Sequence, residues 1–323
     1  IAARTVNTRT LTLGAMLGIC VVLMFSFAFG QYSYDPLDGN YSFVGAFSSK
    51  NQIGLFSSLG ILFAFAALVI LRERGLWRML ALACAVLSAV ALVKAQSATS
   101  VLAIIATLAV LICLKITTWF SPTARKGALI AGLMVALVAV FAAASLGASD
   151  LVLGAFGKDS TLTGRTYLWS QGWAASADAP IFGVGYQAYW VQGFSEAERL
   201  WAEFYIDTRT GFHFHNTYIE VLVELGAIGV LLIAFLMLRI PFGLLRRLAS
   251  ARNDPEALIA FGIAVMFLVR SFVEVDVITP YVVGGFLFYY TAGLLASPLR
   301  SQNATGRVDH HTLGGFVQAD GAG

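Results

Sequence analysis

Charged residues are scarce in this chain. Only 12% of its 323 residues are Asp, Glu, Lys or Arg and 58% are hydrophobic, whereas soluble domains average roughly 25% and 45–50%. Mean hydropathy is +0.78. So few charges cannot cover the surface of one or two soluble domains, and the apolar content excludes a disordered chain. The remaining class is a polytopic membrane protein.

Other signals are also missing. No basic run of five or more residues occurs, and a net charge of +3 is too small to indicate nucleic-acid binding. The three cysteines lie in apolar runs and predict neither a disulfide framework nor a metal site. No signal peptide is recognisable. Because the first residue is Ile1 rather than Met, we expect the natural start to be absent.

Long apolar runs dominate what is present. A membrane-spanning helix needs about 20 mostly apolar residues, and such runs are too long for the alternating strands of a barrel. We therefore expect an all-α polytopic membrane protein with eight spans, at about 11–29, 53–71, 76–93, 101–119, 127–146, 217–238, 257–275 and 278–297. The connection between the last two spans is expected to be a tight turn.

Basic residues are divided unequally between the two sides of this map. The side with both termini holds 14 of the 21 Lys and Arg residues but 5 of the 18 Asp and Glu residues. The more basic side of a membrane protein is cytoplasmic. The other side, with 7 basic and 13 acidic residues, is therefore expected to face outward.

The spans divide the chain into four parts. Residues 1–146 would hold five spans, 147–216 a large outer loop, 217–299 three spans, and 300–323 a disordered cytoplasmic tail. Long loops are usually functional, and a lid without chemistry of its own is the alternative.

The outer loop has two helical patterns. One covers Arg165–Ala177, and the other, about 196–207, follows a capping box formed by Ser195 and Glu198. Together they predict a helical cap lying on the membrane surface.

Ionisable residues near the membrane indicate function by default. Lys50 and Asn51 stand where an outer loop enters the second span, so a lysine beside a capped helix start would suit an anion such as phosphate. A snorkelling lysine is an equal alternative. Arg165 lies in a first helical turn, where its charge opposes the helix dipole, and we expect a phosphate or a salt bridge within the loop as its partner.

The outer loop returns to the membrane at a pair of histidines. Asn216 is a natural N-cap, and His215 just before it is either a general base or a structural histidine. A metal site with His213 is a weaker reading, because no third ligand is visible nearby. Glu220 and Glu224, one helical turn apart, either orient His215 or a cation or form hydrogen bonds within the bundle.

A fourth outer position is Arg270, with Glu274 four residues later. A local ion pair between them is favoured over a phosphate contact. Basic groups and one base candidate thus collect on a side that is acidic overall, which an anionic, membrane-borne substrate would explain. Nucleotides are not indicated, because no GxxxxGK[ST] motif occurs.

Several short motifs occur in one order with consistent membrane placement. They are Lys50-Asn51 with Gly54, Gly164-Arg165-Thr166, Pro180–Gly185, His215-Asn216 with Tyr218 and Glu220, Glu224–Gly229, and Arg270-Ser271 with Glu274. From residue 43 to about 290 the chain resembles the superfamily of O-antigen ligases and Wzy-type polymerases. Its Ser49-Lys50 entry is most similar to exopolysaccharide polymerases of the ExoQ kind.

The resemblance implies a glycosyltransferase of C-type membrane fold in the bacterial inner membrane, with a periplasmic active side and no metal or cofactor. The donor would be an oligosaccharide on undecaprenyl diphosphate, the acceptor a glycan hydroxyl, and the protein partners a chain-length regulator and a flippase. Arg165 would hold the diphosphate and His215 would act as general base. Lys50 and Arg270 would be further diphosphate contacts, and Asn51, Asn216, Glu220 and Glu224 would support the site.

The sequence departs from the family at two points. Ala98 stands where many members have an arginine, which leaves Lys94 as a candidate replacement. Members also have more than eight spans, and we expect the others to precede Ile1. Polymerisation of repeat units is favoured over ligation of a glycan to lipid A-core or protein. A transporter is disfavoured, because no paired broken helices are recognisable.

Overall fold

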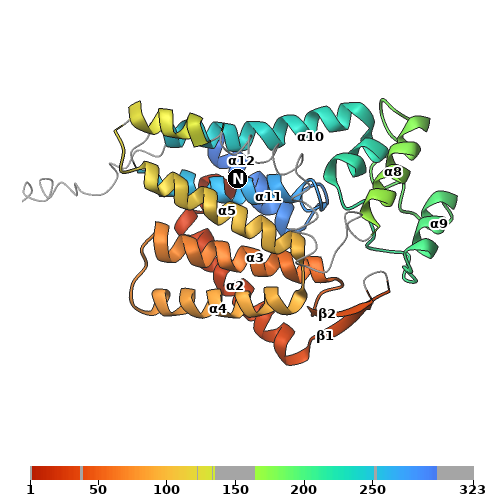
Figure 1. Ribbon diagram of the computed structural model, residues 1–323, viewed down its shortest axis with the longest axis horizontal. Helices are drawn as coiled ribbons and strands as arrows, with labels where there is room; N and C mark the ends of the chain where they lie inside the picture. Colours follow the sequence, from red (N-terminus) through yellow and green to blue (C-terminus); the bar gives the residue numbers. More distant parts are fainter. Residues whose placement is uncertain are drawn as a thin grey trace, which may run out of the picture.

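The computed structural model describes residues 2–36, 39–121, 123–132, 134, 164–250 and 253–296. Its main helices run along the long axis of the molecule, and α8, α9 and a β-hairpin lie at one end (Figure 1). The helices are α1 (Ala2–Thr5), α2 (Thr8–Phe29), α3 (Lys50–Phe65), α4 (Gly75–Ala95), α5 (Ala98–Thr117), α8 (Arg165–Ala175), α9 (Ser195–Glu203), α10 (Thr217–Ser250), α11 (Pro255–Arg270) and α12 (Val283–Ala296).

Five of these helices are long and apolar enough to cross a membrane: α2, α3 with its π-helical extension Ala66–Ile70, α4, α5 and α10. They confirm five of the eight expected spans, and the chain is a polytopic helical membrane protein. The span expected at 127–146 lies largely outside the described residues, as does the tail expected at 300–323.

The last two expected spans are helices of 16 and 14 residues, α11 and α12. Helix α11 ends at Arg270, before the expected boundary, and residues 271–282 form an outer loop instead of a tight turn. This loop contributes to the candidate site described below.

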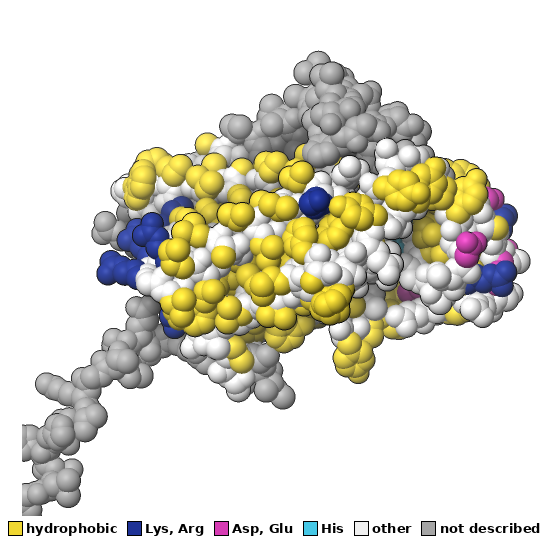
Figure 2. All heavy atoms as spheres, turned by 90° about the horizontal axis from the view of Figure 1, so that it is seen from below, with side chains coloured by type: hydrophobic (Ala, Val, Ile, Leu, Met, Phe, Trp, Pro, Cys, Tyr) yellow, Lys and Arg dark blue, Asp and Glu magenta, His cyan; other side chains and the backbone are white. Residues whose placement is uncertain are grey.

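Helix α3 lies at the centre of the N-terminal helices. In its most apolar stretch 72% of the residues are buried, against 28% in α4 and in α5. Small residues permit the close approach: a Cβ added at Gly60 would lie 2.2 Å from the Ser88 hydroxyl on α4. Figure 2 shows one face of the molecule, where a broad band of hydrophobic side chains separates an end rich in Lys and Arg from an end that carries both charges. This distribution suits a bilayer with the basic end in the cytoplasm.

A two-stranded antiparallel sheet, missed by the all-α expectation, follows α2. Strands β1 (Gln31–Asp35) and β2 (Asn40–Gly45) pair Tyr32 with Phe43 and Tyr34 with Tyr41. Cross-strand aromatic pairs of this kind stabilise hairpins. The hairpin lies at the outer end of the bundle (Figure 1) and brings Asp35 against α3.

The part of the outer loop that the structure describes is a helical cap with its own core. Helices α8 and α9 confirm the two expected helical segments to within four residues at their ends. Leu168, Leu200, Trp201 and Phe214 are buried together, so the apolar face of α9 packs inside the cap rather than on the membrane. The capping box is wrong: Ser195 is the first helical residue, and Glu198 accepts a hydrogen bond from the Gly193 amide.

Two glycine motifs join the cap to α10. At Gly226 (φ 65°, ψ −166°) α10 is interrupted, and the segment 180–185 runs beside the break. The Ala227 amide donates to the Pro180 carbonyl at 2.9 Å and the Val184 amide to the Val223 carbonyl at 3.0 Å. A Cβ at Gly183 or at Gly226 would lie 2.2 Å from the opposing backbone. Both positions therefore require glycine.

Candidate active site

Three residues from distant parts of the chain meet at the outer end of the molecule. The Glu274 carboxylate lies 2.7 Å from Nη2 of Arg165 through one oxygen and 3.5 Å from Nδ1 of His215 through the other. The Glu274 side chain is 4% exposed, Arg165 14% and His215 23%. A buried carboxylate thus links a cation to an imidazole that solvent reaches.

The start of α10 holds this cluster together. Asn216 caps the helix as expected, since its side-chain oxygen accepts hydrogen bonds from the amides of Tyr218 and Ile219. Its amide nitrogen donates to the Phe272 carbonyl at 3.0 Å, and the Thr217 hydroxyl donates to the Glu274 carbonyl at 2.7 Å. The residue after His215 is therefore fixed to the loop that carries Glu274.

His215 adopts a left-handed backbone conformation, with φ of 51°. Its own amide donates to Nδ1 of His213 at 3.0 Å, and the two rings lie 4.3 Å apart. Since Nδ1 of His215 faces Glu274, a proton on that atom leaves Nε2 as the basic nitrogen. Nδ1 itself is buried and, although 3.5 Å from Glu274, forms no hydrogen bond with a residue that the structure describes. Nε2 likewise forms none with the described residues. It is the atom available to a substrate.

The electrostatics favour an ionised carboxylate beside neutral imidazoles. Burial and the Arg165 charge lower the pKa of His215, although Glu274 opposes this. Burial and its neighbour His215 lower the pKa of His213 to about 3. Burial alone would raise the pKa of Glu274, but Arg165, His215 and Arg270 together hold it well below its usual value. At neutral pH, His215 is therefore in the form that accepts a proton.

Arg165 has a partner outside the cap. Nη1 donates to the Val273 carbonyl at 2.6 Å and Nη2 to Glu274, so the alternative of a salt bridge within the large loop is wrong. Spacing could not reveal a partner 109 residues away. A guanidinium has five N–H donors, and Nε makes no hydrogen bond to a described residue. Donors remain for an anion.

The fold brings a possible third metal ligand, Glu274, close to the two histidines, although it is distant from them in the sequence. One ligand atom each from His213, His215 and Glu274 lies within 4.8 Å of the others. However, Nδ1 of His213 already accepts a hydrogen bond, and the Arg165 cation contacts the same carboxylate. A neighbouring positive charge opposes binding of a cation, so the donor set fits a base and its charge partner better than a metal.

Lys50 lies within electrostatic reach of this cluster. Its charge is among those that lower the pKa of His215, and its ammonium pairs with Asp35 of the hairpin at 2.7 Å. The cap of α3 is Ser49, not Asn51 as expected. Asn51 instead accepts a hydrogen bond from Ser97 at 3.0 Å.

Arg270 is almost fully buried, at 1% exposure. It pairs with Asp276 at 2.6 and 3.2 Å and donates to the Ser100 hydroxyl at 2.9 Å. The expected ion pair with Glu274 is wrong. The Glu274 amide still donates to the Arg270 carbonyl at 2.7 Å, but the Glu274 carboxylate lies against Arg165 and His215, and Arg270 pairs with Asp276 instead. Through Asp276, Arg270 holds the outer loop after α11 in place. Lys94 is exposed on α4, with its ammonium 3.3 Å from the Tyr32 hydroxyl.

Glu220 and Glu224 bind the cap rather than the His215 ring. Glu220 accepts hydrogen bonds from the Phe214 amide at 2.7 Å and from the Trp190 indole at 3.0 Å. Glu224 interacts with the Gln187 backbone. Glu220 thereby fixes the residue immediately before His215.

Comparison with known proteins shows the family of this chain. Residues 83–234, which include Arg165 and His215, match the family model described as O-antigen ligase (Wzy_C). The chain is 54% identical over 305 residues to the exopolysaccharide production protein ExoQ of Rhizobium meliloti (strain 1021), an alignment that covers 94% of this chain and 70% of that protein. The chain therefore belongs to the O-antigen ligase (Wzy_C) family.

Proposed function

We propose that this protein is a metal-independent glycosyltransferase of the bacterial inner membrane. It joins polysaccharide repeat units carried on undecaprenyl diphosphate, at the periplasmic face. The observation that carries the proposal is the neutral His215, held against Glu274 and beside Arg165 at the outer end of the bundle. The relative named as an exopolysaccharide production protein supports polymerisation.

In this mechanism His215 is the general base. Nε2 takes the proton of the acceptor hydroxyl while that oxygen bonds to the anomeric carbon of the donor sugar. The bond from that carbon to the diphosphate breaks on the opposite face, so the configuration inverts. Glu274 stabilises the imidazolium that forms. Its role is to position and charge-balance His215 rather than to contact substrate.

Arg165 stabilises the negative charge that develops on the departing undecaprenyl diphosphate. Its planar fork suits two phosphate oxygens. Lys50 supplies a second positive charge near His215. Arg270 and Lys94 remain proposed diphosphate contacts, of which Arg270 has the fewer free donors because Asp276 and Ser100 occupy it.

Ligation is the second candidate, favoured by the description of the matching family model. There the same base would act on a hydroxyl of lipid A-core or a protein. A transporter would need neither a base nor a leaving-group cation. A flippase that delivers the donor and a regulator of chain length are the proposed protein partners.

The test is a reconstitution of the natural full-length protein in lipid vesicles. An undecaprenyl diphosphate-linked repeat unit is the only sugar supplied, and products are weighed by mass spectrometry. We expect a ladder of longer lipid-linked glycans. An intact donor, consumed only when a lipid A-core or protein acceptor is added, would instead establish ligation.

A further inference from the structure

A second cationic site lies at the opposite, inner end of the molecule. The π-helical end of α3, the following loop and the start of α4 form an open groove of about 330 Å³, lined by Leu68, Arg72, Glu73, Arg74, Arg78 and Leu82. The volume is within the range of small-ligand sites. No step of the proposed transfer reaction uses it.

The charges of the groove are unbalanced. Its one carboxylate, Glu73, pairs with Arg9 of α2 through two hydrogen bonds, at 2.5 and 2.9 Å. The guanidinium groups of Arg72, Arg74 and Arg78 form no hydrogen bond or ion pair within the described ranges. Three exposed arginines therefore face an open groove without a counter-charge.

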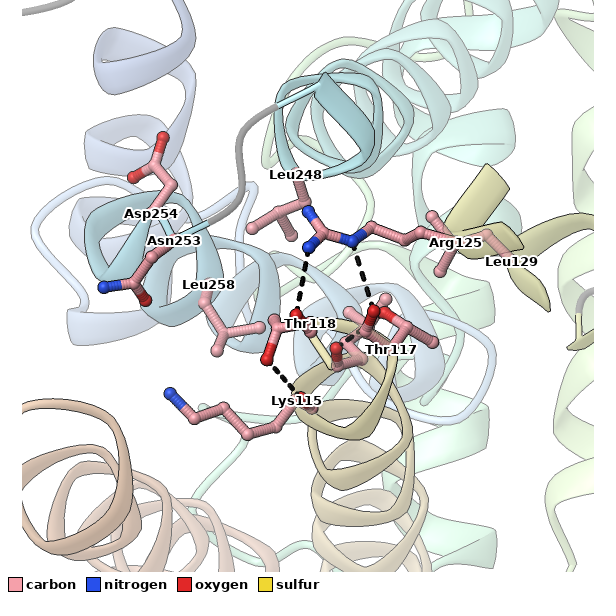
Figure 3. A pocket seen from close by; sticks show the side chains of 10 residues that line it. Lys115, Thr117, Thr118, Arg125, Leu129, Leu248, Asn253, Asp254 and Leu258 are labelled. Atoms are coloured by element: carbon pink, nitrogen blue, oxygen red, sulfur yellow. Dashed lines mark hydrogen bonds between the residues drawn. The ribbon is translucent and has the colours of Figure 1, made fainter. Parts of the chain in front are cut away.

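Two other inner arginines differ in this respect. Arg247 pairs with Asp254 and Glu256. Arg125 donates to the carbonyls of Thr117 and Thr118, where it caps the end of α5 beside a neighbouring pocket (Figure 3). These are structural uses of arginine. The positive-inside rule explains why arginines collect at this end, but it does not explain three unpaired ones around one groove.

The backbone beside the groove is unusual. Residues 66–70 form a π-helix, a feature common at functional sites. Arg72 is held in a left-handed conformation, with φ of 56°, which is uncommon outside glycine. Both features lie where the chain leaves α3 and shape the wall that carries the first arginine.

An apolar stripe continues from the groove along α4. Leu76, Met79, Leu82 and Val86 follow helical spacing and are 44–72% exposed, and Leu82 itself lines the groove. In a bilayer this stripe faces lipid chains at the level where the arginines meet phosphate. A soluble anion would use the arginines alone, whereas a phospholipid would use both parts.

We propose that this groove binds the headgroup of an anionic phospholipid, with its phosphate among Arg72, Arg74 and Arg78 and an acyl chain along α4. Each basic residue near a membrane surface contributes roughly a fivefold preference for anionic lipid, so three predict a preference of roughly 100-fold. The site is independent of the transfer chemistry at the outer end.

Native mass spectrometry tests the proposal. The full-length protein in mild detergent receives equal amounts of phosphatidylglycerol and phosphatidylcholine, and retained lipids are counted. The wild type should retain phosphatidylglycerol preferentially. Replacing all three arginines with Gln should abolish the preference, and replacing all three with Lys should keep most of it, because the positive charge remains.

Arg246→Gln is the matched control, since Arg246 is an exposed inner arginine outside the groove. It should behave as the wild type. The proposal is overturned if the wild type shows no preference, if the triple Gln protein keeps it, or if Arg246→Gln loses as much as each single groove variant. Should the triple protein not fold, the three single Gln variants carry the test, each with an expected loss of about fivefold.

Discussion

Glu274→Gln is the sharpest test of how the candidate active site works. Gln has nearly the same shape, so it can still accept the Arg165 hydrogen bond that Glu274 accepts at 2.7 Å. It removes the negative charge that faces Nδ1 of His215 at 3.5 Å. The substitution therefore separates the charge of this residue from its packing.

The magnitude follows from the role of the base. A positioned general base contributes roughly 10²–10⁴ in rate, and Glu274 supports both its orientation and the imidazolium formed in the transition state. We expect kcat to fall about 10²–10³-fold, or about 3–4 kcal/mol of transition-state stabilisation. KM should change little, because Glu274 does not contact substrate in this mechanism.

The pH profile gives a readout that a purely structural role would not move. Burial and Arg165 lower the pKa of His215, so the wild-type acid limb should lie below the ordinary imidazole value of about 6.5. Glu274 opposes that lowering. Its loss therefore lowers the pKa of His215 further, and the acid limb should move to still lower pH while the plateau falls.

The assay is initial-rate measurement of glycan extension between pH 4.5 and 8, in vesicles. Glu203→Gln is the control, because its ion pair with Arg199 is exposed on the cap and such pairs contribute about 0–1 kcal/mol. An unchanged plateau with an unchanged acid limb in Glu274→Gln would refute the proposed pairing of carboxylate and base.

Three further outcomes are expected. Arg165→Lys should reduce kcat about 100-fold in the same assay, because a point charge cannot bind Val273, Glu274 and a phosphate together; wild-type turnover would make Arg165 structural. His213→Ala should lower kcat about tenfold, because the His215 amide loses its hydrogen bond to Nδ1 of His213. His213→Asn should restore part of the lost kcat. An equal loss of kcat in both variants would argue against a role for that hydrogen bond. Gly226→Ala should destabilise the protein by at least about 3 kcal/mol in thermal unfolding, whereas Gly14→Ala, with open space around it, should be neutral or stabilising.

The spanning helices could be predicted because a 20-residue apolar run has few alternatives in a bilayer. The hairpin could not, since Tyr32, Tyr34 and Tyr41 also fit an aromatic belt at the membrane interface. Spacing rules hold only where a helix continues. The four-residue spacing predicts a pair between Arg270 and Glu274, but α11 ends at Arg270 and the Glu274 carboxylate lies against Arg165.

In the candidate site, too, local features could be predicted from the sequence, and contacts between distant segments could not. Asn216 as a cap and His215 beside it are local features, and the sequence predicted both positions. For His213 the sequence indicates only a metal ligand, because no spacing rule predicts a ring that accepts a hydrogen bond from the amide two residues later. Asp276 and Ser100, which hold Arg270, come from a loop and a different helix. Contacts of that kind depend on how the helices pack.

His215→Ala in the reconstituted system tests the central claim most directly. Wild-type and variant proteins are inserted in equal amounts, checked by thermal unfolding, and given the undecaprenyl diphosphate-linked repeat unit. We expect a ladder of extended glycans from the wild type and intact donor from a folded His215→Ala protein. Extension at the wild-type rate by the variant would contradict the assignment of His215 as the base.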